Sequence, residues 1–298
     1  MSKSSKIIMF SMLGFFLCLF IVGTFFDLQI NEAIFHNKDT FGLVISVLGT
    51  IPGYAMFAFI GGGALSYGVN KEYKTWIRVI SFISCAGCYF ASIYFAGREF
   101  FGPNGFYHYV SDLVGFAMMV PVMGAVVYLG FRLTKKSENK NLWIVYLVLF
   151  VALVIALVPG TTLLKVIFNR PRFRSVSTCE MEYYPWYTAV RNRAELMDLY
   201  NIEKEEFKSF PSGHASSSIA FPLFVLFLPY INKDYKKYVL PLFIGGLAWA
   251  LLVMFARMYV GAHYLSDVSM GAILTTVCIL IGALILSNSK KVSTLIEN

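Results

Sequence analysis

The stretch LWIVYLVLFVALVIALVPGTTLL (residues 142–164) contains no charged residue over its whole length. A helix needs about 20 consecutive apolar residues to cross the hydrocarbon core of a bilayer, so this stretch predicts a membrane-spanning helix. The rest of the chain has the same character. Of its 298 residues, 57% are hydrophobic and 14% are charged, and the mean hydropathy is +0.65. Such values lie outside the range of ordinary soluble domains.

Apolar segments of similar length precede and follow this stretch. Together they predict about eight spans, at residues 7–26, 43–67, 78–97, 111–131, 142–164, 214–231, 238–256 and 268–287. Few residues are left for a soluble domain, and no internal repeat is visible. The predicted fold class is therefore all-α, a polytopic transmembrane helical bundle.

The net charge of +8 would suggest a nucleic-acid partner in a soluble protein. Here the basic residues gather in alternate loops and at the two chain ends, which excludes that interpretation. They are Lys3 and Lys6; Lys71, Lys74 and Arg78; Arg132, Lys135, Lys136 and Lys140; Lys233, Lys236 and Lys237; and Lys290 and Lys291. The positive-inside rule then predicts a multi-pass protein of the cytoplasmic membrane with both termini in the cytoplasm.

One loop on the predicted outer side breaks this pattern. It follows the span at residues 142–164 and holds Lys165, Arg170, Arg172 and Arg174. Two further polar stretches fall on the same side, PSGH (residues 211–214) and ARMYVGAHYLSD (residues 256–267). Topology therefore brings three chemically unusual stretches to one level of the membrane.

Taken singly, each stretch has a structural interpretation. Long basic side chains often anchor helix ends at the interface, and Ser212 is a plausible helix cap. His263 and Asp267 are four residues apart, which is also the spacing of a local pair on a helix surface.

Taken together, the stretches suit the binding of a phosphate ester. Lys165, Arg172 and Arg257 would supply cations for the phosphate oxygens, the arginines by two-pronged contacts. Ser212 and Gly213 would add a hydroxyl and backbone N–H donors at the positive end of a helix.

The two histidines suit the cleavage of that ester. His263 would attack phosphorus if Asp267 fixes its tautomer and leaves one ring nitrogen unprotonated. His214, on another helix, would protonate the leaving oxygen and then activate water.

This pattern resembles the type 2 phosphatidic acid phosphatase (PAP2) superfamily, in its integral-membrane lipid phosphatase branch. The motifs of that family are Lys, six residues, Arg-Pro; then Pro-Ser-Gly-His; then Ser-Arg, five residues, His, three residues, Asp. Lys165 and Arg172 match the first, residues 211–214 match the second, and Arg257, His263 and Asp267 match the third. Two positions depart from it: Phe173 replaces the proline of the first motif, and Ala256 replaces the serine of the third.

The resemblance implies a hydrolase of phosphate mono- or diesters that uses no metal and no cofactor and works through a phosphohistidine. Within the family, the candidate lipid substrates include undecaprenyl diphosphate, phosphatidylglycerol phosphate and phosphatidic acid. A phosphotransferase with the same intermediate and a non-catalytic lipid-phosphate binder or transporter are the alternatives. Glu203, Glu205 and Glu206 have no convergent histidine and do not indicate a metal site.

The resemblance also predicts a division of the chain. Residues 1–75 would be additional N-terminal spans, and residues 76–298 a six-helix phosphatase core with an outward loop at residues 165–212. Within this loop, a short helix is expected near residues 194–200. Its aromatic residues Tyr183, Tyr184, Trp186 and Tyr187 indicate either a lid over the site or an interfacial anchor.

Overall fold

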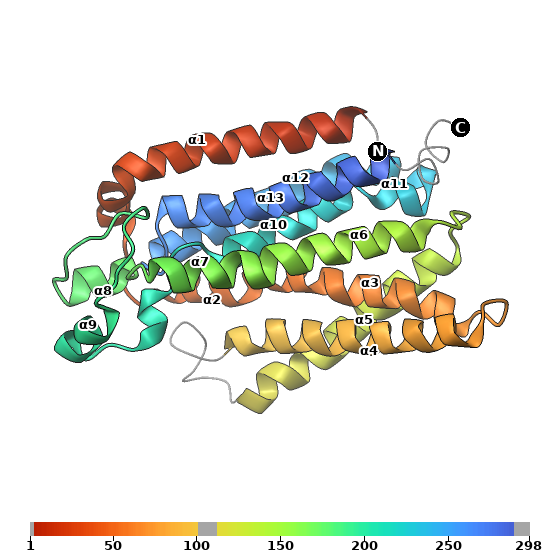
Figure 1. The fold of residues 1–298 in the computed structure, drawn as a ribbon, viewed down its shortest axis with the longest axis horizontal. Coiled ribbons are helices and arrows are strands. Elements are labelled where there is room, and N and C mark those ends of the chain that lie inside the picture. The colour runs from red at the N-terminus through yellow and green to blue at the C-terminus, as the bar shows by residue number, and fades with distance from the viewer. Residues whose placement is uncertain (1–2, 101–111, 289–298) are drawn as a thin grey trace.

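The computed structural model of the protein describes residues 3–100 and 112–288, and in this part of the chain it is a bundle of helices without strands (Figure 1). The first helices are α1 (Lys3–Ile34), α2 (Thr40–Gly49), α3 (Ile51–Val69), α4 (Thr75–Gly97), the 3-10 turn η1 (Arg98–Phe100), α5 (Asp112–Lys135) and α6 (Leu142–Ile155). A π-helical turn η2 (Ala156–Gly160) joins α6 to α7 (Thr161–Phe168).

The second half of the chain begins with short elements and ends with two long helices. They are α8 (Phe173–Thr178), α9 (Arg193–Tyr200), η3 (Lys204–Phe207), α10 (Gly213–Val225), α11 (Leu228–Ile231), η4 (Lys233–Tyr235), α12 (Lys236–Tyr259) and α13 (Leu265–Asn288). The predicted polytopic helical bundle is confirmed, and the chain is a multi-pass membrane protein.

The number of long helices differs from the expected one. Within the described residues, seven rather than about eight helices are long and apolar enough to cross a membrane. The difference lies at residues 214–231, where α10 ends at Val225 and the short α11 follows. Pro229 sits in the first turn of α11, where its missing N–H is tolerated, but it cannot continue the preceding helix.

Helix α10 occupies the interior of the bundle. It packs against α12, α13 and α3, and residues 215–220 are all buried. Two glycines permit this close packing: a Cβ added at Gly271 of α13 would lie 2.2 Å from the Ser212 carbonyl oxygen, and one at Gly53 of α3 would lie 1.9 Å from the Ser217 carbonyl oxygen. The start of α10 is therefore held against α13.

The N-terminal helices pack into the same bundle as the C-terminal ones. α1 lies against α13, α2 against α12, and α3 against α4, α5 and α10. The division of the chain into residues 1–75 and 76–298 stays a prediction.

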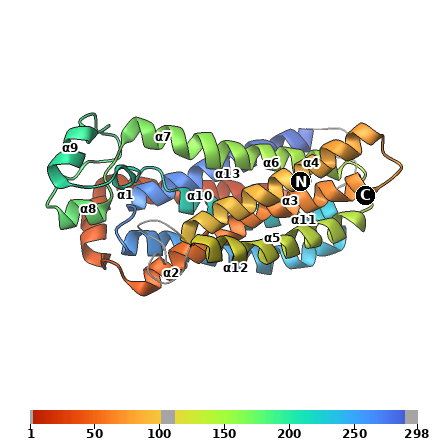
Figure 2. The same ribbon diagram turned by 90° about the horizontal axis from the view of Figure 1, so that it is seen from below.

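The two ends of the bundle differ in composition. The basic connections α3–α4, α5–α6 and α11–α12 lie at one end, whereas α8, α9 and the α12–α13 connection lie at the other (Figures 1 and 2). Lys290 and Lys291 lie outside the described residues.

The long connection between α7 and α10 forms a compact cap at this second end. Helix α9 confirms the short helix expected near residues 194–200. Val176, Met181, Val190 and Phe207 form a small apolar core inside the cap. Trp186 stacks on Phe210 with ring centroids 5.5 Å apart, and its indole N–H donates to Thr24 Oγ1 of α1 over 3.0 Å.

Candidate active site

The turn between α12 and α13 determines where His263 lies. Gly261 has a φ of 64°, a left-handed conformation that costs glycine little. The N–H of Gly261 donates to the Met258 carbonyl over 2.8 Å, and the N–H of Ala262 donates to the Arg257 carbonyl over 3.0 Å. These two bonds form a Schellman motif that ends α12. His263 follows this turn, just before α13 begins.

The structure brings the two predicted histidines together. The ring centroids of His214, in the first turn of α10, and His263 are 6.5 Å apart. Ser212 caps α10, because its hydroxyl oxygen accepts a hydrogen bond from the Ala215 N–H over 3.3 Å. The Ser212 N–H in turn donates to the Asp267 carbonyl over 2.9 Å, which ties the start of α10 to α13.

The contacts of His263 determine which of its ring nitrogens is free. Its Nδ1 lies 2.7 Å from the backbone carbonyl oxygen of Ser209, whereas the nearest Asp267 oxygen is 3.7 Å away. A carbonyl oxygen can only accept a hydrogen bond, so Nδ1 carries the proton and Nε2 keeps its lone pair. The hydrogen bond that fixes the His263 tautomer is therefore accepted by the Ser209 carbonyl, whereas the sequence analysis assigned it to Asp267. Asp267 acts on the ring through its charge.

The surroundings of His263 also keep the ring neutral. Burial lowers its pKa well below the ordinary value; the Asp267 carboxylate opposes this shift, while Arg257 and Arg172 reinforce it. An unprotonated Nε2 is the form required for nucleophilic attack.

Arg170 connects Asp267 to the first helix. Its Nη1 lies 2.6 Å from Asp267 Oδ1, and its Nη2 lies 2.9 Å from Asp27 Oδ2, with all three side chains fully buried. The guanidinium also donates to the Tyr184 carbonyl, the Ser266 hydroxyl and the Tyr183 hydroxyl. Its five N–H groups therefore have five acceptors. We call Asp27, Arg170, Ser209, Ser266 and Asp267 the Arg170 network.

Helix α1 contacts the His263 segment at two points. Asp27 Oδ1 accepts from the Ser266 N–H over 2.9 Å, and Asn31 Nδ2 donates to the His263 carbonyl over 3.0 Å. Ser209 completes the Arg170 network, since its hydroxyl donates to Asp267 Oδ2. Helix α1 thus helps to position His263 and Asp267, the histidine and the aspartate of the third motif.

The three predicted phosphate-binding cations gather beside the histidines, and we call Lys165, Arg172 and Arg257 the cationic cluster. Lys165 lies in the last turn of α7, within electrostatic reach of the other two. A Cβ added at Gly213 would lie 3.7 Å from Lys165 Nζ. Within residues 3–100 and 112–288, therefore, all eight predicted site residues lie at one end of the bundle.

Arg257 differs from Arg170 in its hydrogen bonds. Its side chain is fully buried, yet Nε, Nη1 and Nη2 have no acceptor in the described part of the chain. A buried charge without a partner is costly. Because guanidinium groups pair with phosphate and carboxylate oxygens, this arrangement is typical of an anion-binding site.

Glu99 is a site residue that the sequence analysis missed. It lies in η1 at the end of α4, and its Oε2 is 3.2 Å from His214 Nε2. This contact orients the His214 ring. Asp27, Ser209 and Ser266 were missed as well, and so was the role of Arg170 as their common partner. The sequence offered two signals for them. One is the basic cluster on the predicted outer side, and the other is Asp27, a carboxylate at the end of the first apolar segment.

The two departures from the family motifs have different surroundings. Phe173 is buried and packs edge-on against Phe35 and Tyr264, with ring centroids 5.1 and 5.9 Å away. It is the first residue of α8, a position where proline and other residues are both tolerated. Ala256 is fully buried in α12 next to Arg257.

Two of the three glutamates at residues 203–206 pair with basic residues. Glu206 pairs with Arg174 and accepts from the Ser175 hydroxyl, and Glu205 pairs with Lys208. Burial would raise the pKa of Glu206, but its contacts with Arg174 and Arg172 lower it to about 2. Within the described residues, no group of three or more His, Cys, Asp or Glu side chains is arranged to hold a metal ion.

Comparison with known families gives one match. The PAP2 superfamily matches residues 141–291, slightly more than half of the chain. All eight predicted site residues and Arg170 fall inside the matched segment, whereas Asp27 and Glu99 precede it. No curated protein and no solved structure matches the chain.

Proposed function

This chain belongs to the PAP2 superfamily, and from that membership we propose that it is a membrane lipid phosphatase acting through a phosphohistidine on His263. Its substrate would be a lipid phosphate or diphosphate, and the reaction would need no metal. PAP2 proteins are generally phosphatases, which supports the assignment of phosphatase activity to this chain.

The observation that carries the proposal is the buried Arg257 guanidinium without an acceptor in the described residues. It lies with Lys165 and Arg172 beside a neutral histidine whose Nδ1 is occupied by the Ser209 carbonyl. Three cations next to a free imidazole nitrogen suit an anionic centre that is attacked by that nitrogen.

The first step would form a bond between His263 Nε2 and phosphorus and break the bond from phosphorus to the lipid oxygen. The cationic cluster and the N–H groups at the start of α10 would stabilise the charge on the phosphoryl oxygens. His214 would give its proton to the leaving oxygen.

The second step would reverse the role of His214. As a base, it would take a proton from water, whose oxygen then attacks the phosphorus of the phosphohistidine. The bond to Nε2 would break, and inorganic phosphate and free His263 would be released. The Arg170 network would hold His263 and Asp267 in place through both steps.

The position of the site at one end of the bundle supports a lipid substrate with its phosphate at headgroup level. The basic connections lie at the opposite end (Figure 1), so the positive-inside rule gives an extracytoplasmic site in the cytoplasmic membrane. Undecaprenyl diphosphate, phosphatidylglycerol phosphate and phosphatidic acid are the substrates to test first.

The test is phosphate release by the detergent-purified protein from these lipids, with chelator present and no metal added. We expect release by the wild type, no release by His263→Ala and full release by His36→Ala, a matched control because His36 is exposed at the same end. Radiolabelled phosphate should become attached to His263 in an acid-labile form. Activity of His263→Ala equal to that of the wild type would overturn the mechanism. Phosphate transfer to an added lipid, without release, would indicate a phosphotransferase.

A further inference from the structure

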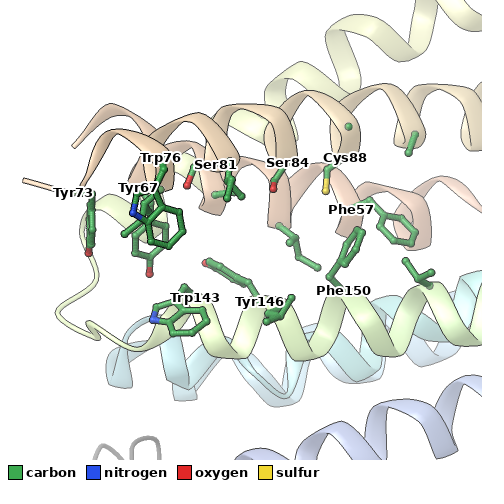
Figure 3. A pocket seen from close by; sticks show the side chains of 18 of the residues that line it. Phe57, Tyr67, Tyr73, Trp76, Ser81, Ser84, Cys88, Trp143, Tyr146 and Phe150 are labelled. Atoms are coloured by element: carbon green, nitrogen blue, oxygen red, sulfur yellow. The ribbon is translucent and has the colours of Figure 1, made fainter. Parts of the chain in front are cut away.

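A long apolar groove runs between α3, α4 and α6, and neither His214 nor His263 is among its lining residues. Its volume is about 850 Å³. Figure 3 shows aromatic side chains facing each other across it, Tyr67, Tyr73 and Trp76 on one side and Trp143, Tyr146 and Phe150 on the other. Along α4 the groove extends from Trp76 to Phe95, about 28 Å at 1.5 Å per residue. It is therefore longer than one leaflet of the hydrocarbon core, about 15 Å.

A polar hollow of about 700 Å³ adjoins this groove at the basic end of the bundle. It lies where the α3–α4 connection faces the α5–α6 connection, and Tyr67 and Tyr73 line both spaces. The hollow and the apolar groove thus share a wall.

The lining of the hollow is cationic. Lys71, Lys135 and Lys140 contribute three positive charges, and Glu72 contributes the one carboxylate among the lining residues. In the part of the chain that the structure describes, none of the three lysines forms an ion pair. Ser137 and Asn139 add polar groups beside them. The hollow has no histidine or cysteine in its lining, so it suits the binding of an anion and not its hydrolysis.

We propose that the two spaces together form a binding site for one anionic phospholipid. Its phosphate would lie among Lys71, Lys135 and Lys140, and one acyl chain would lie in the groove between α4 and α6. Basic residues at a membrane surface attract anionic headgroups, and a lipid is the ligand that joins an anion directly to a long apolar chain. With the orientation proposed above, this lipid comes from the cytoplasmic leaflet, opposite the substrate.

The headgroup half of the site is tested by native mass spectrometry of the full chain with phosphatidylglycerol. We expect the wild type to retain one lipid and K71Q/K135Q/K140Q to bind it at least tenfold more weakly. The matched control is K233Q/K236Q/K237Q, which removes three exposed lysines of another basic connection and should bind like the wild type. Equal binding by the two triple variants, or equal binding of phosphatidylcholine by the wild type, would overturn the proposal.

The acyl-chain half is tested by filling the groove. Gly87 lines the groove, and a Cβ added there meets no atom within 4 Å, so Gly87→Phe can fold and occupy the space. Gly245 on α12 has equally open surroundings and lies outside the groove, so Gly245→Phe is the control. We expect Gly87→Phe to lose phosphatidylglycerol binding and Gly245→Phe to retain it. Gel filtration should confirm that both variants are folded.

Two other results would contradict the proposal. If inorganic phosphate binds in a lysine-dependent way and Gly87→Phe leaves lipid binding intact, the hollow is a site for soluble anions. If Gly87→Phe lowers phosphatase activity but leaves phosphatidylglycerol bound, the groove holds the tail of the substrate. The measurements of lipid binding do not depend on whether the histidine mechanism is correct.

Discussion

Arg170 and Arg257 lie at the same end of the bundle, and both side chains are fully buried, yet their surroundings are opposite. Arg170 contacts two carboxylates, two hydroxyls and a carbonyl. Arg257 has no hydrogen-bond acceptor among residues 3–100 and 112–288. Within the described residues, protein groups therefore compensate the charge of Arg170 and leave the Arg257 guanidinium without a hydrogen-bond acceptor.

This difference separates two groups of residues. The Arg170 network holds the site together, whereas the cationic cluster is the group proposed to bind the substrate. The Arg170 network joins α1, the cap and α13, and each of its charged side chains contacts a group of opposite charge. The cationic cluster places three positive charges beside His263, an arrangement that favours the binding of an anion. Breaking the Arg170 network should therefore lower stability, whereas substitutions in the cationic cluster should lower activity without lowering stability.

The largest effect is expected for Arg170→Met. It leaves Asp27 and Asp267 buried without their common cation, and breaking a buried ion pair costs about 3–5 kcal/mol. The thermal midpoint in detergent should fall strongly. Arg191→Met, at an exposed arginine of the cap, should leave it unchanged. Equal midpoints for the two variants would show that the Arg170 network contributes nothing to folding.

Arg257→Gln should have the reverse profile. Loss of a cation that stabilises the phosphoryl oxygens is expected to lower kcat/KM by roughly 10²–10³-fold. The thermal midpoint should stay the same or rise, because an unpaired buried charge is removed. A marked loss of stability with normal kcat/KM would reverse the assignment of the two arginines.

Asp27→Asn tests whether α1 positions the catalytic segment. The amide retains the shape of the carboxylate but weakens its bonds to Arg170 and the Ser266 N–H. We expect kcat to fall by about 10- to 100-fold through misplacement of His263. KM should hold, since Asp27 does not belong to the cationic cluster. A change in KM alone would contradict a positioning role.

The pH profile gives a finer test. Burial, together with Arg257, lowers the pKa of His263, so the neutral nucleophile persists as the pH falls below the ordinary histidine value of about 6.5. The acidic limb of kcat/KM should therefore lie below pH 6.5 in the wild type. In Arg257→Gln it should move to higher pH, and in Arg191→Gln it should not move when the same substrate is used. An unshifted limb in Arg257→Gln would separate Arg257 from the charge state of His263.

The smallest effect is expected for Ala256→Ser, which restores the serine of the family motif next to Arg257. The added hydroxyl can donate to a phosphoryl oxygen, so phosphate release should be unchanged or higher, by up to about 10-fold. A loss of activity together with a lower thermal midpoint would mean that the buried position has no room for the hydroxyl.

Much of the molecule could be predicted from local patterns. Apolar runs predicted the long helices, because a helix that crosses a bilayer must satisfy its backbone internally and present apolar side chains. Three motifs in order predicted the eight site residues. The segment at residues 214–231 was predicted less well, since its interior position in the bundle permits serines and a break at Leu226 and Phe227.

The sequence alone therefore determined that the chain is a membrane helical bundle, that its site lies at one end, and that His214, His263 and the cationic cluster belong to it. Only the tertiary structure decided which side chains pair with Arg170 and with His214. Asp27 and Arg170 are 143 positions apart, and Glu99 reaches His214 from the end of α4. Spacing along the chain is local, whereas the choice of partner for a buried charge depends on which helices pack together. For this reason two arginines of similar appearance in the sequence differ so completely in the fold.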